Sequence, residues 1–119
     1  MKVAMSNENA IEVSADDVNQ RMTENPAGAD WLLLDCREQS EYDTACIAGS
    51  SLIPMNEIPD RVSEIEAYRS KPIVVFCHGG IRSLRVTNWL REQGFNSAQS
   101  MIGGIDAWSQ EIDSNVPRY

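Results

Sequence analysis

The sequence is poor in the side chains that bind soft metals. Its 119 residues include three cysteines and a single histidine, and no two cysteines form a Cys-x-x-Cys pair. A structural zinc site takes four such ligands at tight spacing, so we expect neither a metal nor a bound cofactor. An odd set of cysteines, in a chain long enough to build a core, also argues against a disulfide framework. At least one thiol is therefore expected to be free and reactive.

The sequence also lacks long apolar runs and an excess of basic residues. No stretch approaches a length of about 20 apolar residues, which a membrane helix needs, and the N-terminus has no basic-then-apolar signal pattern. The net charge of −8 argues against nucleic acid or an anionic membrane as a partner. A small anionic substrate stays open, because local dipoles outweigh a distant global charge beyond a Debye length of about 8–10 Å. We expect a cytoplasmic protein.

Short apolar segments alternate with amphipathic ones along the chain. Strands are predicted at 11–13, 31–34, 51–53, 73–76 and 98–101, and helices at 15–22, 40–44, 58–68, 84–93 and 105–111. This alternation indicates an α/β domain whose central parallel sheet has about five strands and carries helices on both faces. A flexible segment over residues 1–10 is expected to precede one domain over residues 11–119, with the C-terminal tail packed against it.

The strand predicted at 73–76 runs directly into Cys77 and a short loop. The loop consists of His78, Gly79, Gly80, Ile81 and Arg82. Its two glycines allow the backbone to curl with its N–H groups pointing inward. Those groups, together with the positive end of the following helix dipole, would stabilise an anion on sulfur. We therefore predict a Cys77 thiolate at neutral pH, at the sheet end where open α/β sheets bind ligands.

The run from Cys77 to Ser83 resembles the active-site loop of single-domain rhodaneses, which follow a Cys-x-x-Gly-x-Arg-Ser pattern. Further motifs similar to that family occur in the same order: Asp35-Cys36-Arg37-Glu38 with Glu41-Tyr42, Ile47-Ala48-Gly49-Ser50 with Ile53-Pro54, and Gly103-Gly104-Ile105-Asp106-Ala107-Trp108. The resemblance covers nearly the whole chain and implies a rhodanese-like fold. It also implies a rhodanese-type sulfurtransferase, similar to thiosulfate:cyanide sulfurtransferases.

The resemblance implies a role for each matching residue. Cys77 would accept sulfane sulfur from thiosulfate or a persulfide donor, hold it as a covalent persulfide, and pass it to a thiophilic acceptor. The substrate-binding residues would be His78, Gly79, Gly80, Ile81, Arg82 and Ser83. Arg82 would help to hold an anionic donor, and Ser83 would cap the following helix. Asp35 and Arg37 would support the loop structurally.

Two other functions are left open. The segment Val116-Pro117-Arg118-Tyr119 resembles the end of rhodanese domains fused to adenylyltransferases, so the chain could carry persulfide sulfur for a partner protein in trans. The other alternative is a cysteine-based phosphatase or arsenate reductase. Phosphatases of this architecture use a wider Cys-x5-Arg loop, whereas Arg82 gives Cys-x4-Arg here, and the shorter ring favours sulfur over a phosphoryl group.

Three positions depart from the family pattern. His78 stands where arginine is common. It either binds the anionic donor, lowers the pKa of the thiol, or faces solvent. Cys46 stands where the family often has histidine, and we favour a small buried residue over a second redox thiol. Cys36 stands where the family has valine, directly after a buried strand. That position favours a core residue still more strongly.

Overall fold

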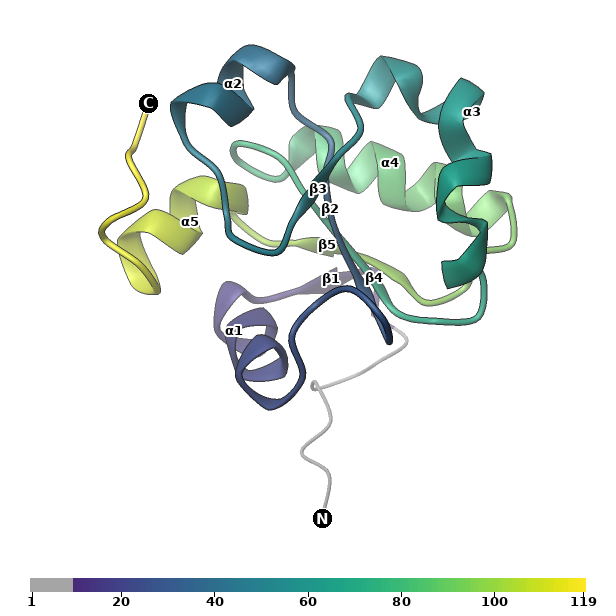
Figure 1. Cartoon of the computed structure of the whole chain (residues 1–119), viewed down its shortest axis with the longest axis horizontal. Helices are drawn as coiled ribbons and strands as arrows, with labels where there is room; N and C mark the ends of the chain where they lie inside the picture. Colours follow the sequence, from purple (N-terminus) through teal and green to yellow (C-terminus); the bar gives the residue numbers. More distant parts are fainter. Residues whose placement is uncertain (1–9) are drawn as a thin grey trace.

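The computed structural model describes residues 10–119 (Figure 1). The strands are β1 Glu12–Val13, β2 Leu32–Asp35, β3 Ser51–Leu52, β4 Ile73–Phe76 and β5 Ala98–Met101. The α-helices are α1 Ala15–Glu24, α2 Gln39–Thr44, α3 Ile58–Arg61, α4 Ile81–Glu92 and α5 Gly104–Glu111. Two 3-10 helices, η1 Met55–Glu57 and η2 Val62–Tyr68, flank α3. The predicted flexible segment lies outside the described residues except for Ala10.

The five strands form one parallel sheet in the order β1-β5-β4-β2-β3. Every residue of β2 and of β4 is buried, as expected for parallel strands that are covered on both faces. Helices α1 and α5 pack on one face, and α3, η2 and α4 pack on the other. The prediction of a parallel sheet with helices on both faces is confirmed.

The sheet separates two hydrophobic cores, because successive side chains of a strand point to opposite faces. Along β4, Val74 and Phe76 enter the core under α1 and α5. Val75 and Cys77 enter the core under α3 and α4, where Cys36 also lies. The alternation therefore places two of the three cysteines on one face of the sheet, at the carboxyl ends of two neighbouring strands.

The structure differs from two of the predicted helices. The segment predicted as one helix over 58–68 is a single α-turn followed by the 3-10 helix η2. The apolar residues Val62, Ile65 and Tyr68 recur every three residues, which suits three residues per turn as well as an α-helix.

Within residues 10–119, no helix has both the length and the apolar character that crossing a membrane would require.

Helix α4 begins at Ile81, three residues earlier than predicted. Its N-cap is Gly80, whose φ of +111° lies in the left-handed region that favours glycine. Ser83 therefore lies inside the first turn and does not cap the helix, which corrects the role predicted for it. Its side chain is buried and faces Cys77 instead.

Candidate active site

The Cys77 sulfur accepts hydrogen bonds from the first turn of α4. The backbone N–H groups of Gly80 and Ser83 donate to it at 3.1 and 3.3 Å, and the Ser83 hydroxyl lies 3.5 Å away. Ser83 Oγ is also 2.8 Å from the hydroxyl of Ser100 in β5. The Ser100 hydroxyl can therefore donate to Ser83 while Ser83 donates to the sulfur. This arrangement stabilises a thiolate on Cys77.

A second thiol lies beside the first. A hydrogen bond from the Cys36 side chain is the main cause that lowers the pKa of Cys77 to about 4, and the contacts with Ser83 and Gly80 lower it further against the opposing effect of burial. The same interaction with Cys77 raises the pKa of Cys36, and burial raises it too. The Cys36 thiol, which donates to the Phe76 carbonyl oxygen at 3.4 Å, therefore keeps its proton while Cys77 carries the charge. The predicted Cys77 thiolate has a physical basis in this geometry.

Hydrogen bonds from the first turn of α5 hold the backbone of the cysteine loop in place. The N–H groups of Ile105 and Asp106 donate to the carbonyl oxygens of Cys77 and His78, at 2.9 and 3.1 Å. A Cβ atom on Gly104 would overlap both of those oxygens. The Gly-Gly motif before Trp108 therefore allows α5 to approach the loop closely enough to bind it.

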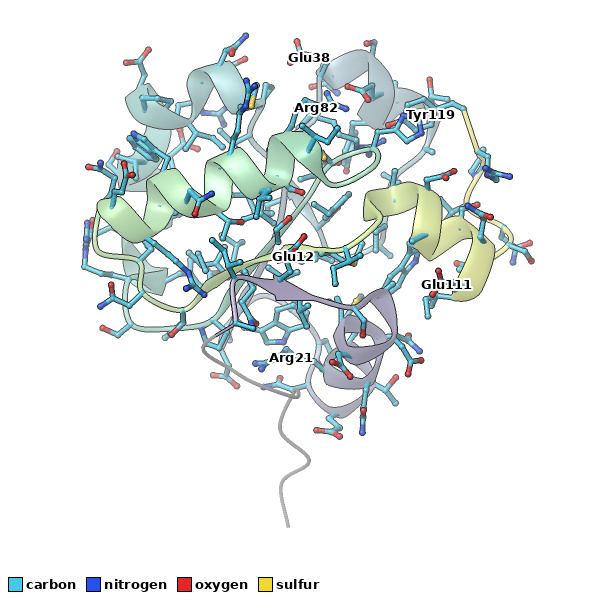
Figure 2. The ribbon with its side chains drawn as sticks, turned by 180° about the vertical axis from the view of Figure 1, so that it is seen from behind. Glu12, Arg21, Glu38, Arg82, Glu111 and Tyr119 are labelled. Carbon is cyan, nitrogen blue, oxygen red and sulfur yellow. The ribbon has the colours of Figure 1, made fainter. Side chains whose placement is uncertain are left out.

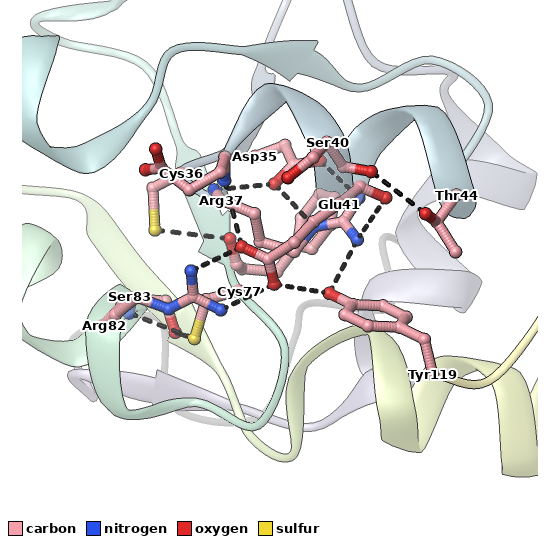
Figure 3. Close-up of polar contacts among 12 residues, drawn as sticks. Asp35, Cys36, Arg37, Ser40, Glu41, Thr44, Cys77, Arg82, Ser83 and Tyr119 are labelled. Atoms are coloured by element: carbon pink, nitrogen blue, oxygen red, sulfur yellow. Dashed lines mark hydrogen bonds and ion pairs between the residues drawn. The ribbon is translucent and has the colours of Figure 1, made fainter.

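Arg82 forms a bidentate ion pair at the rim of the site. Its two Nη atoms donate to the carboxylate oxygens of Glu41 in α2 at 2.7 and 2.9 Å (Figure 3). The Arg82 contact lowers the pKa of Glu41 to about 2. The Tyr119 hydroxyl donates to the same carboxylate at 2.8 Å and accepts from Arg37 at 2.9 Å. The C-terminal residue therefore meets Arg82 through a shared carboxylate, on the same side of the molecule (Figure 2).

The predicted support residues Asp35 and Arg37 form a fully buried ion pair. The distance between Arg37 Nη2 and Asp35 Oδ2 is 2.7 Å, and neither side chain is exposed. Arg37 also donates to the carbonyl oxygens of Ala45 and Glu41. These contacts tie the end of β2 to the middle of α2 and to its C-cap residue, Ala45.

The remaining loop residues are placed as follows. Gly79 and Ile81 are exposed, and Ile81 is 77% exposed, so it stands at the outer edge of the site. His78 is half-buried and stacks against the Tyr119 ring with centroids 4.3 Å apart. His78 therefore neither points freely into solvent nor stands alone at the loop. A depression lined by Cys77, His78, Gly79, Ile81 and Arg82 opens the site to solvent.

Cys46 corrects a sequence-based interpretation. The residue is exposed, so the favoured reading of a small buried replacement is wrong. Its neighbours Ala45 and Ile47 are buried, and the extended backbone between them turns the intervening side chain outward.

Among residues 10–119, no group of three or more His, Cys, Asp or Glu side chains is placed to hold a metal ion.

Sequence reasoning missed three contributors to the site. Glu41 belongs to the motif Asp35-Cys36-Arg37-Glu38 with Glu41-Tyr42, and its place in that motif is a signal that could have identified it as a site residue. Ser100 and Tyr119 reach the site from β5 and from the C-terminal tail. No motif includes Ser100, and the motif that ends at Tyr119 did not place that residue beside Cys77. Their contribution depends on which strands and segments lie beside Cys77.

Comparisons with known proteins identify the family to which the chain is similar. The family described as rhodanese-like domain matches residues 14–111. An adenylyltransferase and sulfurtransferase of Zea mays is 35% identical over 97 residues, which cover 77% of this chain and 21% of the maize protein. A sulfurtransferase of Allochromatium vinosum is 31% identical over 99 residues, which cover 83% of this chain and 88% of that protein.

A solved structure is also similar. A rhodanese-related protein of Thermoplasma volcanium matches with a TM-score of 0.74 and 28% sequence identity, over 87% of this chain and 94% of that one. The chain spans between 20% and 40% of the length of several curated relatives that it matches. Because the family match covers residues 14–111, which is most of the chain, this chain belongs to the rhodanese-like domain family.

Proposed function

We propose that the chain is a sulfurtransferase that carries sulfane sulfur as a persulfide on Cys77. The observation that supports this most directly is the set of donors on the Cys77 sulfur: two backbone N–H groups at 3.1 and 3.3 Å and the Ser83 hydroxyl at 3.5 Å. Donors fixed in this way stabilise a thiolate before reaction and a sulfur anion after it.

The proposed reaction has two displacement steps. The Cys77 thiolate attacks the outer sulfur of thiosulfate, the bond between the two donor sulfurs breaks, and sulfite leaves with the electron pair. A thiophilic acceptor such as cyanide then attacks the outer sulfur of the Cys77 persulfide. Thiocyanate leaves and the thiolate is restored. The low pKa of Cys77 makes its sulfur a good leaving group in the second step.

An anionic donor would meet positive charge at the loop despite the acidic chain. The N-terminus of α4 presents its first N–H groups there, and the Arg82 guanidinium stands at the rim. Because Glu41 holds the Arg82 guanidinium in place, we propose that Arg82 offers hydrogen-bond donors in a fixed position at the rim of the loop. Its remaining N–H groups, and those of the loop, would orient the donor.

Intact-mass measurement after treatment with thiosulfate tests this proposal. The wild-type chain is expected to gain the mass of one sulfur atom and to lose it on addition of cyanide. Cys77→Ser is expected to gain nothing, while Cys46→Ser serves as the matched control for loss of a thiol. A cyanide-labile sulfur on Cys77→Ser would contradict the role proposed for Cys77.

A second candidate function is that of a persulfide carrier for a partner protein. Ile81 and Ile102 are 77% and 51% exposed, and both line a depression beside the cysteine loop. Exposed apolar side chains at the mouth of a site suit a protein surface better than a small anion. The maize relative, named an adenylyltransferase and sulfurtransferase, also makes a sulfur-carrier protein a reasonable acceptor to propose.

Steady-state turnover separates the two functions. Continuous formation of thiocyanate from thiosulfate and cyanide supports the enzyme. Loading of Cys77 without such turnover, followed by transfer only when a protein acceptor is added, supports the carrier. Hydrolysis of a phosphate or arsenate ester that survives cyanide treatment would contradict both.

A further inference from the structure

Cys36 and Cys77 form a facing pair on neighbouring strands. Asp35 of β2 is registered with Phe76 of β4, and the Cys36 N–H donates to the Phe76 carbonyl oxygen at 3.1 Å, so the ladder continues one step beyond both strands. Cys36 and Cys77 are the next pair in that register. Both side chains belong to the core under α3 and α4, so they point to the same face of the sheet.

The spacing of the pair suits a covalent bond between the two sulfurs. Paired strands lie about 4.7–4.9 Å apart, which falls within the Cα–Cα range of about 4.4–6.8 Å that disulfides span. The two residues are 0% and 1% exposed, so outside reagents reach them only through the loop. Figure 3 shows both sulfur atoms beside the Arg82 guanidinium, which interacts electrostatically with both.

We propose that Cys36 is a resolving thiol, which displaces the sulfur carried by Cys77 as hydrogen sulfide and closes a Cys36–Cys77 disulfide. The inference rests on the proposed persulfide, and it adds an activity to sulfur transfer: reductive release of the sulfur when no acceptor takes it. Cys36 would then be more than the core residue that its position after a buried strand predicts.

The step balances without an external oxidant. A bond forms between the sulfurs of Cys36 and Cys77, and the bond between Cys77 and the outer sulfur breaks. The outer sulfur leaves with that electron pair and takes the proton that Cys36 gives up, so the product is the hydrosulfide ion. Cys36 is oxidised and the outer sulfur is reduced. A small dithiol would return the pair to its reduced form.

The electrostatics of the pair explain why the step would follow loading. In the resting protein the Cys36 thiol donates to the Phe76 carbonyl oxygen at 3.4 Å, and the neighbouring Cys77 thiolate raises the pKa of Cys36, so Cys36 keeps its proton and is a poor nucleophile. A persulfide on Cys77 moves the negative charge to the outer sulfur, which removes the main cause that raises the pKa of Cys36. Cys36 then gives up its proton more readily, and the departing hydrosulfide takes that proton.

The experiment follows the loaded protein without an acceptor. Wild type, Cys36→Ser and Cys46→Ser are loaded with thiosulfate, freed of excess donor, and incubated without oxygen while intact mass and released sulfide are recorded. Cys36→Ser keeps a hydrogen-bond donor but has no thiol, so it separates positioning of Cys77 from attack on it. Cys46→Ser controls for the loss of an exposed cysteine.

Wild type and Cys46→Ser are expected to lose the added sulfur and two further hydrogens, with one sulfide released per chain. The persulfide of Cys36→Ser is expected to persist about ten times longer, because its hydroxyl does not attack sulfur. Equal rates in wild type and Cys36→Ser would overturn the inference. If no variant gained sulfur, the proposed persulfide itself would be refuted, and the inference with it.

A measurement on the unaltered protein guards against a Cys36→Ser chain that does not fold. Peptide mapping of loaded and aged wild type under non-reducing conditions is expected to recover Cys36 linked to Cys77. Recovery of both residues as free thiols after the sulfur has left would overturn the inference without any variant.

Discussion

At Cys77, a buried sulfur atom meets more hydrogen-bond donors than an ordinary core cysteine would need. Burial of an anion in an apolar core is costly unless the charge is paired or hydrogen-bonded. Here the first turn of α4 and the Ser83 hydroxyl supply the donors, and the Cys36 thiol adds another. The site therefore stabilises charge on sulfur through fixed groups.

The first prediction concerns the pH dependence of Cys77 alkylation. Because the pKa of Cys77 is lowered to about 4, the thiolate persists far below the ordinary range of a cysteine. The alkylation rate of Cys77 with iodoacetamide is expected to stay constant between about pH 6 and 8 and to fall as the pH approaches 4. Mass spectrometry of the Cys77 peptide gives the rate.

Two variants test the causes of that low pKa. Cys36→Ala removes the largest cause, so the midpoint of the profile is expected to rise further than it does in Ser83→Ala, which keeps the Ser83 N–H donor. A wild-type rate that climbs steadily through about pH 8, as for an unperturbed thiol, would contradict the thiolate.

At the scale of secondary-structure elements, the start of α5 determines the shape of the cysteine loop. Two N–H groups of its first turn bind the loop carbonyl oxygens, and Gly104 has a φ of +57° at the point of closest approach. The carboxyl end of β4, the start of α4 and the start of α5 therefore form one hydrogen-bonded unit. The Gly-Gly motif acts on the site through the backbone of Cys77 and His78.

The second prediction is that Gly104→Ala disrupts this unit. A methyl group would overlap the carbonyl oxygens of Cys77 and His78, which are backbone atoms that cannot turn aside. Unfolding in urea is expected to show a loss of about 1–3 kcal/mol, typical of overpacking in a dense core. Sulfur loading of Cys77 is expected to slow as the loop moves.

Gly79→Ala, in the cysteine loop that Gly104 contacts, is the matched control for stability. A Cβ atom there meets nothing within 4 Å, and Gly79 is not among the glycines with positive φ. Its free energy of unfolding is expected to stay close to that of wild type. Equal losses in the two variants would show that the contact of Gly104 with the loop is not the cause.

At the scale of the whole molecule, Glu41 joins three parts of the chain that are distant in sequence. It lies in α2, accepts from Arg82 in α4, and accepts from Tyr119 at the C-terminal end. The Glu41 side chain is 18% exposed and that of Arg82 is 32% exposed, so water screens the pair only in part. The site is thus tied to both halves of the sequence.

The third prediction is a loss of stability in Glu41→Gln that depends on pH. Folding lowers the Glu41 pKa from 4.5 to about 2, so its contribution is fully present above pH 4.5 and is lost as the pH falls through about 2. At about pH 7 the variant is expected to lose about 1 kcal/mol of unfolding free energy. The difference from wild type is expected to shrink towards about pH 2.

Glu64→Gln provides the control for an exposed ion pair. Glu64 pairs with Arg61 at 2.8 Å on the outside of η2, where its side chain is 52% exposed. Urea unfolding of this variant is expected to show a much smaller loss, because solvent screens such a pair. A loss in Glu41→Gln that stays the same at low pH would contradict a contribution from the ionised carboxylate.

The sequence by itself determined the layered α/β fold and the place of the nucleophile. Buried strands read as continuous apolar runs, and alternation with helices leaves few arrangements other than a parallel sheet. The segment around Cys77 carries its own turn residues and its own helix, so local rules predicted an anion site there. The start of this helix was predicted too late, after Ser83, because the left-handed conformation of Gly80 starts the helix at Ile81.

Only the tertiary structure decided what surrounds Cys77. The strand order β1-β5-β4-β2-β3 places β2 and β5 on either side of β4, and so brings Cys36 and Ser100 to the same sulfur site from distant positions in sequence. The exposure of Cys46 and the contact between Tyr119 and Glu41 likewise follow from packing. Such contacts depend on the register of the strands and on the face of the sheet that each side chain enters. The residues that meet are far apart in sequence, so a local pattern around one of them does not identify its partner.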